Sequence, residues 1–135
     1  MNKERLYERL KNYRKASSRL NEAIKLDSEN DIIVDGVIQR FEFTFELSWK
    51  LIKIFLEFNG INEIRSPRDA IQEAFSYGLI EDGANWIDML IDRNKISHIY
   101  DEEEARLIYE KITQKYNDLL IKFADMMNDK INEII

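Results

Sequence analysis

Residues 32–59 read IIVDGVIQRFEFTFELSWKLIKIFLEFN, and this stretch decides the fold because its apolar residues recur at helical spacing along two neighbouring stripes. The first stripe contains Ile33, Val37, Phe41, Thr44, Ser48, Leu51 and Phe55. The second stripe contains Val34, Ile38, Phe45, Ile52 and Leu56. A helix that is apolar over more than half of its circumference is buried on two sides. The stretch is therefore predicted to be the central helix of a bundle, or a helix that also lines a subunit interface.

Four further helices are predicted on either side of this central one. Together the five cover about residues 2–26, 32–59, 66–78 and 82–97, and the chain from 101 to near the C-terminus. Asp31 is the predicted N-cap of the central helix. The later helices start at Ser66, Asp82 and Asp101. No strand-like alternation is present, so the predicted fold is all-α: an antiparallel up-and-down four-helix bundle, one side of which is made of two shorter helices.

The apolar faces of the later helices are predicted from the same periodicity. The helix at 66–78 presents Ala70, Ile71, Ala74 and Phe75. The last helix presents Ala105, Ile108, Ile112, Leu119, Phe123, Met126 and Ile131. Trp49 and Trp86 are expected to be core residues, with a platform for stacking bases as the alternative, and Trp49 is a candidate binding residue for that reason.

The length and composition limit which kinds of protein this chain can be. With 135 residues, of which 44% are apolar and 34% charged, the chain is expected to form a single domain, residues 1–135. It has no cysteine and no run of about 18 apolar residues, so thiolate chemistry and a membrane span are not expected. The N-terminus lacks the apolar segment of a signal peptide, which predicts a cytoplasmic protein.

Charge is unevenly distributed along the chain. The net charge is −6, which disfavours non-specific binding to nucleic acid. Residues 1–19 contain seven lysines and arginines but two acidic residues, a net charge of +5, so the remainder carries −11. The basic first helix either docks an anionic partner or is an ordinary solvated helix face.

The chemically capable side chains gather in the stretch DRNKISHIYD, residues 92–101. It contains the only histidine of the chain, His98, with Arg93 five residues before it and Tyr100 two residues after it. Positions five apart on a helix differ by about 140° in direction and about 7.5 Å in height. Arg93 and His98 can therefore converge only if the helix ends near His98, or if a second subunit closes the gap.

Arg93 and His98 are the candidate catalytic residues. An arginine can hold a phosphate through paired hydrogen bonds, and a histidine can transfer protons near neutral pH. Together they would suffice for metal-free cleavage of RNA, in which a 2′-hydroxyl attacks its own phosphate. Asn94 lies four residues before His98 and could orient the imidazole, and Ser97 lies four residues after Arg93 and could steady the guanidinium.

Arg93 and His98 could instead have a structural role. A histidine at a helix end is often a capping or packing residue. An arginine there often pairs with a carboxylate such as Asp88 or Asp92. Many acidic residues surround this stretch, and an acidic rim is a poor platform for RNA.

Glu42 and Glu46 are a second candidate site, because residues four apart share a helix face. They could bind a metal or a ligand, or serve as acid and base; the alternative is pairing with Arg40 or Lys50. The sequence contains no Gly-rich phosphate loop and no His/Cys metal spacing, so no cofactor or resident metal is expected.

Three ordered stretches of the chain resemble a known family. They are RFEFTFELSWK at residues 40–50, SPRDA at 66–70, and DMLIDRN followed by SHIY between 88 and 100. In these stretches the chain is similar to the nucleotidyltransferase substrate-binding protein family of the HEPN superfamily. The resemblance implies a helical bundle that forms a homodimer. It also implies a partner, a separate minimal nucleotidyltransferase encoded beside it, as in two-gene toxin–antitoxin modules.

The resemblance also implies roles for the stretch at 92–101. The ribonuclease motif of the superfamily, an arginine followed after four to six residues by a histidine, maps onto Arg93 and His98. In related toxins the tyrosine two residues after the histidine receives AMP from the partner, and that position is Tyr100. The leading hypothesis is a binding subunit that presents the segment from Arg93 to Tyr100 to the nucleotidyltransferase, which itself performs nucleotidyl transfer. The alternative is a metal-independent ribonuclease that acts on RNA and is silenced by modification of Tyr100.

Overall fold

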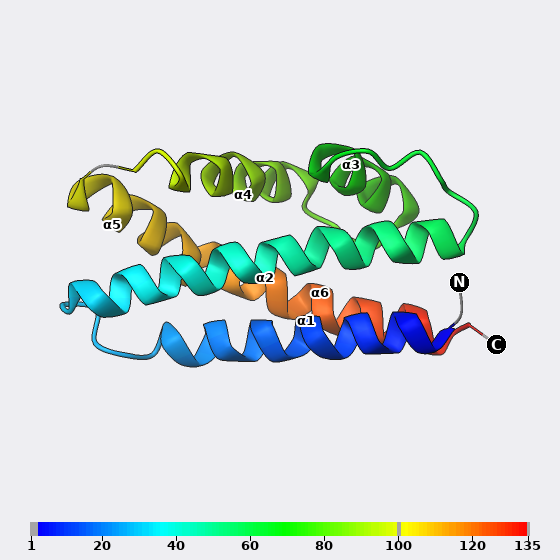
Figure 1. Cartoon of the computed structure of the whole chain (residues 1–135), viewed down its shortest axis with the longest axis horizontal. Helices are drawn as coiled ribbons and strands as arrows, with labels where there is room; N and C mark the ends of the chain where they lie inside the picture. Colours follow the sequence, from blue (N-terminus) through cyan, green and yellow to red (C-terminus); the bar gives the residue numbers. More distant parts are fainter. Residues whose placement is uncertain (1–2, 100, 135) are drawn as a thin grey trace.

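The computed structural model describes residues 3–99 and 101–134 (Figure 1). Its helices are α1 (Lys3–Ala23), α2 (Asp31–Phe58), α3 (Pro67–Tyr77), α4 (Gly83–Ile96), α5 (Glu102–Lys111), the π-helix η1 (Ile112–Tyr116) and α6 (Asn117–Asn132). Within these described ranges no residue is in a β-strand, and the predicted all-α class is confirmed. None of the helices in the described ranges is long and apolar enough to cross a membrane.

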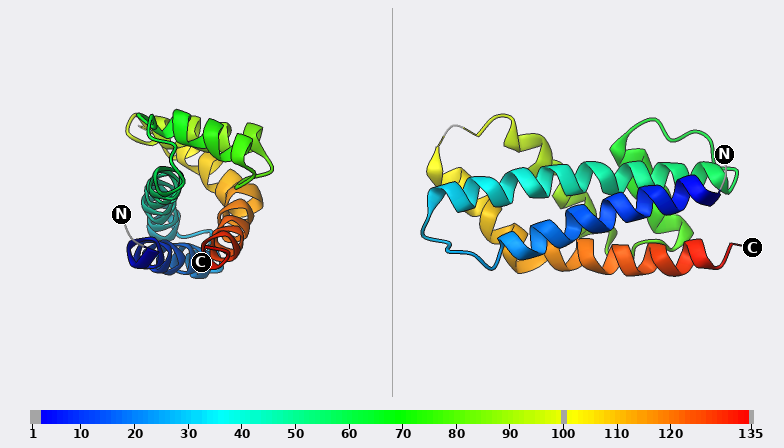
Figure 2. Two further views of the ribbon diagram at one scale, coloured as in Figure 1. Left: turned by 90° about the vertical axis from the view of Figure 1, so that its right-hand side faces the viewer. Right: turned by 60° about the horizontal axis from the view of Figure 1, so that its bottom comes forward.

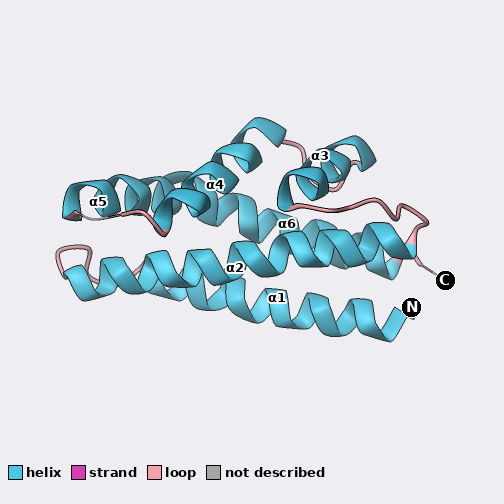
Figure 3. Cartoon of the chain, turned by 45° about the horizontal axis from the view of Figure 1, so that its top comes forward, coloured by secondary structure: helices cyan, strands magenta, loops and turns pink. Residues whose placement is uncertain are grey.

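The helices form an antiparallel up-and-down bundle, as predicted. α1 and α2 are antiparallel neighbours, α3 and α4 run back along α2, and α5, η1 and α6 return to the end where both termini lie (Figure 1). An extended loop joins α2 to α3, so that the two shorter helices together form one side of the bundle (Figure 3). The end-on view places this side opposite α1 (Figure 2).

α2 is the central helix of the bundle. It contacts α1, α3, α4, α5 and α6. Every residue of its two predicted stripes is buried except Ile33, which is partly buried. Neighbouring helices of the same chain therefore cover most of its apolar surface. Phe43 and Ile32 remain exposed, at 59% and 79%.

The N-cap of α2 differs from the prediction by one residue. Asn30, not Asp31, accepts a hydrogen bond from a main-chain N–H of the first turn, at 2.9 Å from Ile32 N. Asn30 has the extended backbone that a cap requires, whereas Asp31 is already helical. The carboxylate of Asp31 pairs instead with Arg106 of α5, at 3.2 Å.

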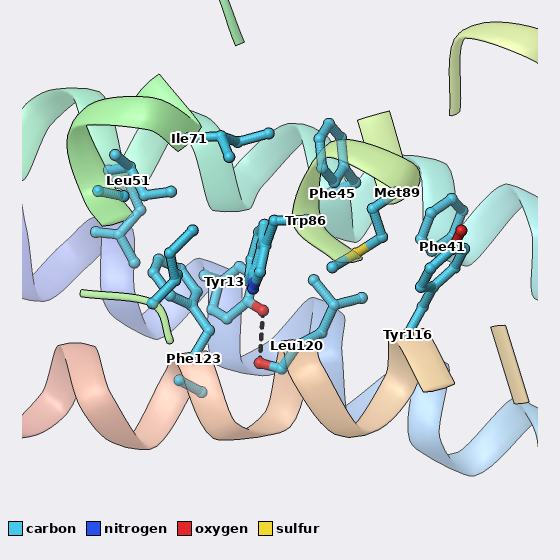
Figure 4. Close-up of a cluster of buried hydrophobic side chains, with 14 of the residues drawn as sticks. Tyr13, Phe41, Phe45, Leu51, Ile71, Trp86, Met89, Tyr116, Leu120 and Phe123 are labelled. Atoms are coloured by element: carbon cyan, nitrogen blue, oxygen red, sulfur yellow. Dashed lines mark hydrogen bonds between the residues drawn. The ribbon is translucent and has the colours of Figure 1, made fainter. Parts of the chain in front are cut away.

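Aromatic rings fill the centre of the core (Figure 4). Trp86 of α4 is 2% exposed and packs edge-on against Phe123 of α6, with ring centroids 5.2 Å apart. Tyr13 of α1 donates its hydroxyl hydrogen to the main-chain carbonyl of Leu120, at 2.7 Å. The prediction that Trp86 is a core residue is confirmed, and these contacts fix α4 and α1 against the last helical segment.

The last predicted helix is not one regular α-helix. Its middle is the π-helix η1, whose turn holds about one residue more than an α-helical turn. The extra residue shifts the faces that follow it. Leu120 and Met127 are buried, whereas the predicted Leu119 and Met126 are only partly buried. Leu119 nevertheless packs against the core, as predicted. The prediction differs from the structure in placing Met126 rather than Met127 on the buried face, because it assumed a uniform period of 3.6 residues.

The predicted core position of Phe75 is also wrong. Phe75 is 54% exposed, while its neighbour Ala74 is fully buried. Adjacent residues on a helix point about 100° apart, and the short α3 packs only a narrow stripe against the rest of the bundle. The Phe75 ring lies instead over the start of α4, where a Cβ added to Gly83 would be 3.2 Å from its Cδ2.

Candidate functional site

Arg93 lies near the end of α4 and lines a groove of about 660 Å³ between α1, α2 and α4. Arg19 of α1 and Arg40 and Phe43 of α2 line the same groove. Nη2 of Arg93 is 3.6 Å from Oε2 of Glu46, and both side chains are 33% exposed. The Nε of Arg93 is buried and has no hydrogen-bond acceptor among the described residues. Because a guanidinium carries five N–H donors, Arg93 can still bind an anion that enters the groove.

His98 lies in the turn after α4, close to where the helix was predicted to end. α4 ends at Ile96, and the main-chain N–H of His98 donates to the carbonyl of Lys95, at 2.8 Å. The side chain of His98 is exposed and lines a second depression, of about 840 Å³, between α4 and α5. Arg93 lines the groove and His98 lines the depression, and neither lines both. A helix end near His98 therefore does not bring the two side chains into one site within a single chain.

Asn94, Ser97 and Tyr100 are the other polar residues of this segment for which contacts or roles were predicted. The Ser97 hydroxyl donates to the main-chain carbonyl of Asn94, at 3.3 Å, and both residues are exposed. The expected contacts of Asn94 with His98 and of Ser97 with Arg93 stay predictions. Tyr100 lies outside the described residues, so its accessible position on a turn stays a prediction as well.

Asp92 is buried directly beside Arg93 in the sequence. Its carboxylate accepts hydrogen bonds from the Tyr116 hydroxyl and from Nζ of Lys111, the latter 3.1 Å from Oδ2. Burial and the hydrogen bond to the Asp92 carboxylate raise the pKa of Tyr116 well above its usual value. Tyr116 therefore remains a neutral donor at physiological pH, and it fixes Asp92 in the core.

The carboxylate that pairs with Arg93 differs from the two that were considered. Asp88 lies 3.9 Å from Lys115, and Asp92 is bound as described above. Glu46 of α2 is the partner instead. The guanidinium is thus linked to the central helix rather than to its own helix.

Glu42 and Glu46 both line the groove, but only Glu46 has the expected partner. Its Oε1 is 3.6 Å from Nζ of Lys50. Arg40 donates to a main-chain carbonyl of α1, at 2.8 Å, rather than to a glutamate. Trp49 is partly buried and packs against the core, with a buried Nε1 that has no acceptor in the described part of the chain. Among the described residues no group of acidic and histidine side chains has the arrangement of a metal site.

Comparison with known proteins places these features in a family. A family model described as nucleotidyltransferase substrate binding protein like matches residues 8–129. The chain belongs to this family. The matched range includes every residue that lines the groove or the depression. Membership in the nucleotidyltransferase substrate-binding-like family therefore covers the candidate site and not only the scaffold.

Individual proteins are also similar to this chain. A Haemophilus influenzae protein named "Probable ribonuclease HepT" is 38% identical over 101 residues, which are 72% of this chain and 66% of that protein. The matched stretch thus spans slightly less than two thirds of that relative. A structure from Thermus thermophilus has a TM-score of 0.74 at 28% identity and covers 90% of this chain and 99% of its own.

A Haemophilus influenzae structure, described as revealing the fold of a substrate binding domain of a nucleotidyltransferase, has a TM-score of 0.68 at 28% identity. It covers 94% of this chain and 99% of its own. The helical architecture of this family member is thus the one found in its relatives of known structure.

Reasoning from the sequence missed three residues of the site. Arg19 and Arg40 line the groove of Arg93, and Tyr116 holds Asp92. A signal for Tyr116 was present in the sequence, because apolar residues recur at every fourth position from Ile108 to Leu120. Such spacing is typical of a helix that contains a wide π-turn. The positive charge of residues 1–19 included Arg19, but nothing local pointed to this groove, since most of its lining residues come from α2 and α4.

Proposed function

We propose that this chain is the binding subunit of a separate minimal nucleotidyltransferase, in a two-gene module of the toxin–antitoxin type, and that it presents the segment from Arg93 to Tyr100 to that enzyme. The observation that carries the proposal is the incompletely paired guanidinium of Arg93. It is one-third exposed, its single ion pair is long at 3.6 Å, and its buried Nε lacks an acceptor among the described residues. Buried donors in a purely structural role are normally satisfied. Membership in the family supports the class of partner.

A homodimer is part of the proposal. In one chain the groove of Arg93 and the depression of His98 are separate, so a second copy is needed to place the two side chains in one site. Leu107, 57% exposed, lines the depression together with His98. An apolar side chain this exposed beside a candidate site is well suited to be covered by a second copy.

The second candidate function is a metal-independent ribonuclease, which the name of the Haemophilus influenzae relative favours. In the proposed reaction the 2′-oxygen bonds to the adjacent phosphorus while the bond from phosphorus to the 5′-oxygen breaks. The products are a 2′,3′-cyclic phosphate and a free 5′-hydroxyl. Arg93 holds the phosphate oxygens and His98 transfers a proton, either from the 2′-hydroxyl or to the leaving 5′-oxygen. AMP attached to Tyr100 would add a negative charge that pairs with Arg93 and blocks the site.

The partner function is tested by co-expression with a nucleotidyltransferase encoded beside this chain. We expect the two proteins to co-purify and Arg93→Ala to weaken the complex. Incubation with the partner, ATP and magnesium should add one or more AMP units to the intact mass, and Tyr100→Phe should abolish the gain. Tyr77→Phe is the control, because Tyr77 is a tyrosine on α3 that is 42% exposed. Failure to co-purify, together with an unchanged mass, would refute the proposal.

The ribonuclease function is tested with purified protein and RNA in the presence of EDTA. Cleavage should persist and leave a cyclic phosphate. Arg93→Ala and His98→Ala should each lower the rate at least about 100-fold, the scale of one acid–base contribution. Lys130→Ala on α6, which removes a cation far along the sequence from this segment, should keep the activity. Cleavage that EDTA abolishes and His98→Ala preserves would exclude this mechanism.

A further inference from the structure

The exposed side of α1 carries positive charge that the proposed function does not use. Between Arg9 and Asn21 the sequence contains no acidic residue but five lysines and arginines: Arg9, Lys11, Arg14, Lys15 and Arg19. All five lie on α1, and four of them are exposed while Arg9 is partly buried. None of the five forms a salt bridge with another described residue.

This absence of pairing is not explained by a shortage of acidic side chains. The chain contains 26 acidic and 20 basic residues, and its net charge is −6. A solvated helix face usually mixes both signs, because like charges four residues apart destabilise a helix and opposite charges stabilise it. Three exposed glutamates of α1, Glu4, Glu8 and Glu22, lie on the same face before and after this run, so the single sign is confined to residues 9–21. On an acidic protein such a run is better suited to attract a polyanion than to stabilise the fold.

Part of this charge forms a line that leads to the groove of Arg93. Lys11, Lys15 and Arg19 are four residues apart, so they follow one another at about 6 Å along α1 and turn about 40° per step around it. Arg19 reaches the groove, where Arg40 and Arg93 also lie. The guanidinium of Arg40 donates to the main-chain carbonyl of Arg19, at 2.8 Å, and so extends the line onto α2. Lys11, Lys15, Arg19 and Arg40 together form the cationic row.

An exposed aromatic ring lies where the cationic row ends. Phe43 lines the groove and is 59% exposed. Proteins hold single-stranded nucleic acids through cations that follow the phosphates and aromatic rings on which bases stack. Glu42 and Glu46 also line the groove, so phosphates are favoured along the row and a base is favoured at the ring. An acidic protein partner would use the cations but would not need the ring.

We propose that the cationic row binds the phosphodiester backbone of a single-stranded nucleic acid, and that Phe43 stacks on a base of that strand at the entrance to the groove of Arg93. A flexible strand can follow cations spaced by one helical turn. This binding deepens the ribonuclease candidate, on which it rests for a strand that enters the groove of Arg93, but its test requires neither cleavage by His98 nor the nucleotidyltransferase.

The test uses a fluorescein-labelled single-stranded RNA with 2′-O-methyl groups, which the proposed cleavage reaction cannot cut. Binding to the wild-type chain is measured by fluorescence anisotropy over a range of salt concentrations. A plot of the logarithm of the affinity against the logarithm of the salt concentration should have a slope of about −3. Each of the four cations of the row is expected to contact one phosphate, and each such contact contributes about −0.7 on a single strand. Lys11→Gln/Lys15→Gln should make the slope shallower by about 1.4 and lower the affinity at least about tenfold near 0.1 M salt. Phe43→Ala should weaken binding at least about fivefold and leave the slope unchanged.

The matched control is Lys122→Gln/Lys130→Gln, which removes the same charge from α6. It should retain the affinity for RNA, and thermal melts of all variants should coincide with that of the wild type. The proposal is overturned if RNA binding is absent or independent of salt, or if the α6 control loses as much affinity as the row variant. A row variant that keeps RNA binding but loses the nucleotidyltransferase would identify the row as a protein-docking surface instead. Because no partner is present in the RNA assay, a negative result there leaves the proposed partner function standing.

Discussion

Asp92 and Arg93 are adjacent in the sequence but lie in opposite environments. Asp92 is 2% exposed and bound by Tyr116 and Lys111, whereas Arg93 lines the open groove. Adjacent residues on a helix point about 100° apart, so the position of one constrains the direction of the other. The contacts that hold Asp92 in the core therefore also set the rotation of α4 that directs Arg93 to the groove.

Tyr116→Phe is expected to lower the free energy of unfolding by about 1.5–3 kcal/mol, because the buried Asp92 carboxylate loses a hydrogen bond to a charged group. Lys111→Ala should cost less than Tyr116→Phe, since the Lys111 side chain is 48% exposed and water can take the place of its ammonium group beside the Asp92 carboxylate. Urea denaturation of both variants measures the difference. Equal losses would contradict the dominant role of the tyrosine.

The same tyrosine predicts a dependence on alkaline pH. The pKa of Tyr116 is raised in the folded chain, so its neutral phenol contributes fully below about pH 10, the usual pKa of tyrosine. As the pH rises above that value, the unfolded chain releases the proton and the folded chain keeps it, so the stabilisation is lost. The difference in unfolding free energy between wild type and Tyr116→Phe should therefore shrink above about pH 10. A constant difference would show that the phenol titrates normally.

At the scale of one element, the π-helix η1 lets buried residues spaced four apart share one face of the last helical segment, although an α-helix has 3.6 residues per turn. Buried residues recur at every fourth position from Ile108 to Leu120. In a regular α-helix twelve residues turn by about 120° beyond whole turns, so the two ends of this run could not share a face. The π-turn holds about one residue more than an α-helical turn and absorbs that rotation.

Deleting Gln114, an exposed residue of η1, is expected to give a folded protein with an α-helical turn in place of the π-turn. After the deletion, the residues at the two ends of the run, Ile108 and Leu120, are eleven positions apart. In a regular α-helix their side-chain directions then differ by only about 20°, so both can still face the core. Deleting Asp125, an exposed residue of α6, removes one residue from a regular helix and should abolish cooperative unfolding. Circular dichroism and urea denaturation compare the two, and similar losses would show that η1 does not act as a one-residue insertion.

At the scale of the whole molecule, the bundle separates the chemically capable groups. The groove with Arg93 lies between α1, α2 and α4, while the depression with His98 lies between α4 and α5. The cationic row approaches the groove from α1. A single bundle thus holds Arg93 and His98 in separate depressions, and the proposed dimer would be the way to combine them.

We predict a two-fold dimer in solution that Leu107→Glu converts to a monomer, because a buried charge at an apolar contact is not compensated. Leu107 is 57% exposed in the single chain, so the substitution should leave the folding of the bundle intact. Light scattering at micromolar concentration measures the mass. Phe75→Glu, at a residue that is 54% exposed in a different groove, is the control and should remain dimeric. A wild-type monomer, or two variants that behave alike, would contradict the prediction.

The sequence by itself determined the helices and the family of this protein. The start signals at Ser66, Asp82 and Asp101 each accept the predicted hydrogen bond from a main-chain N–H three residues later. These features depend on neighbours within one or two turns, so a local pattern contains them. The central position of α2 followed from the width of its apolar surface in the same way.

Only the tertiary structure decided which groups of the site meet. It paired Arg93 with Glu46 of another helix, separated it from His98, and joined Arg19 and Arg40 to its groove. Such contacts depend on how whole helices are rotated and packed against one another. A π-turn of one extra residue changes that rotation by about 100° for everything that follows. Spacing along the sequence does not encode the rotation of each helix about its axis, because that rotation is fixed by the packing of the whole core.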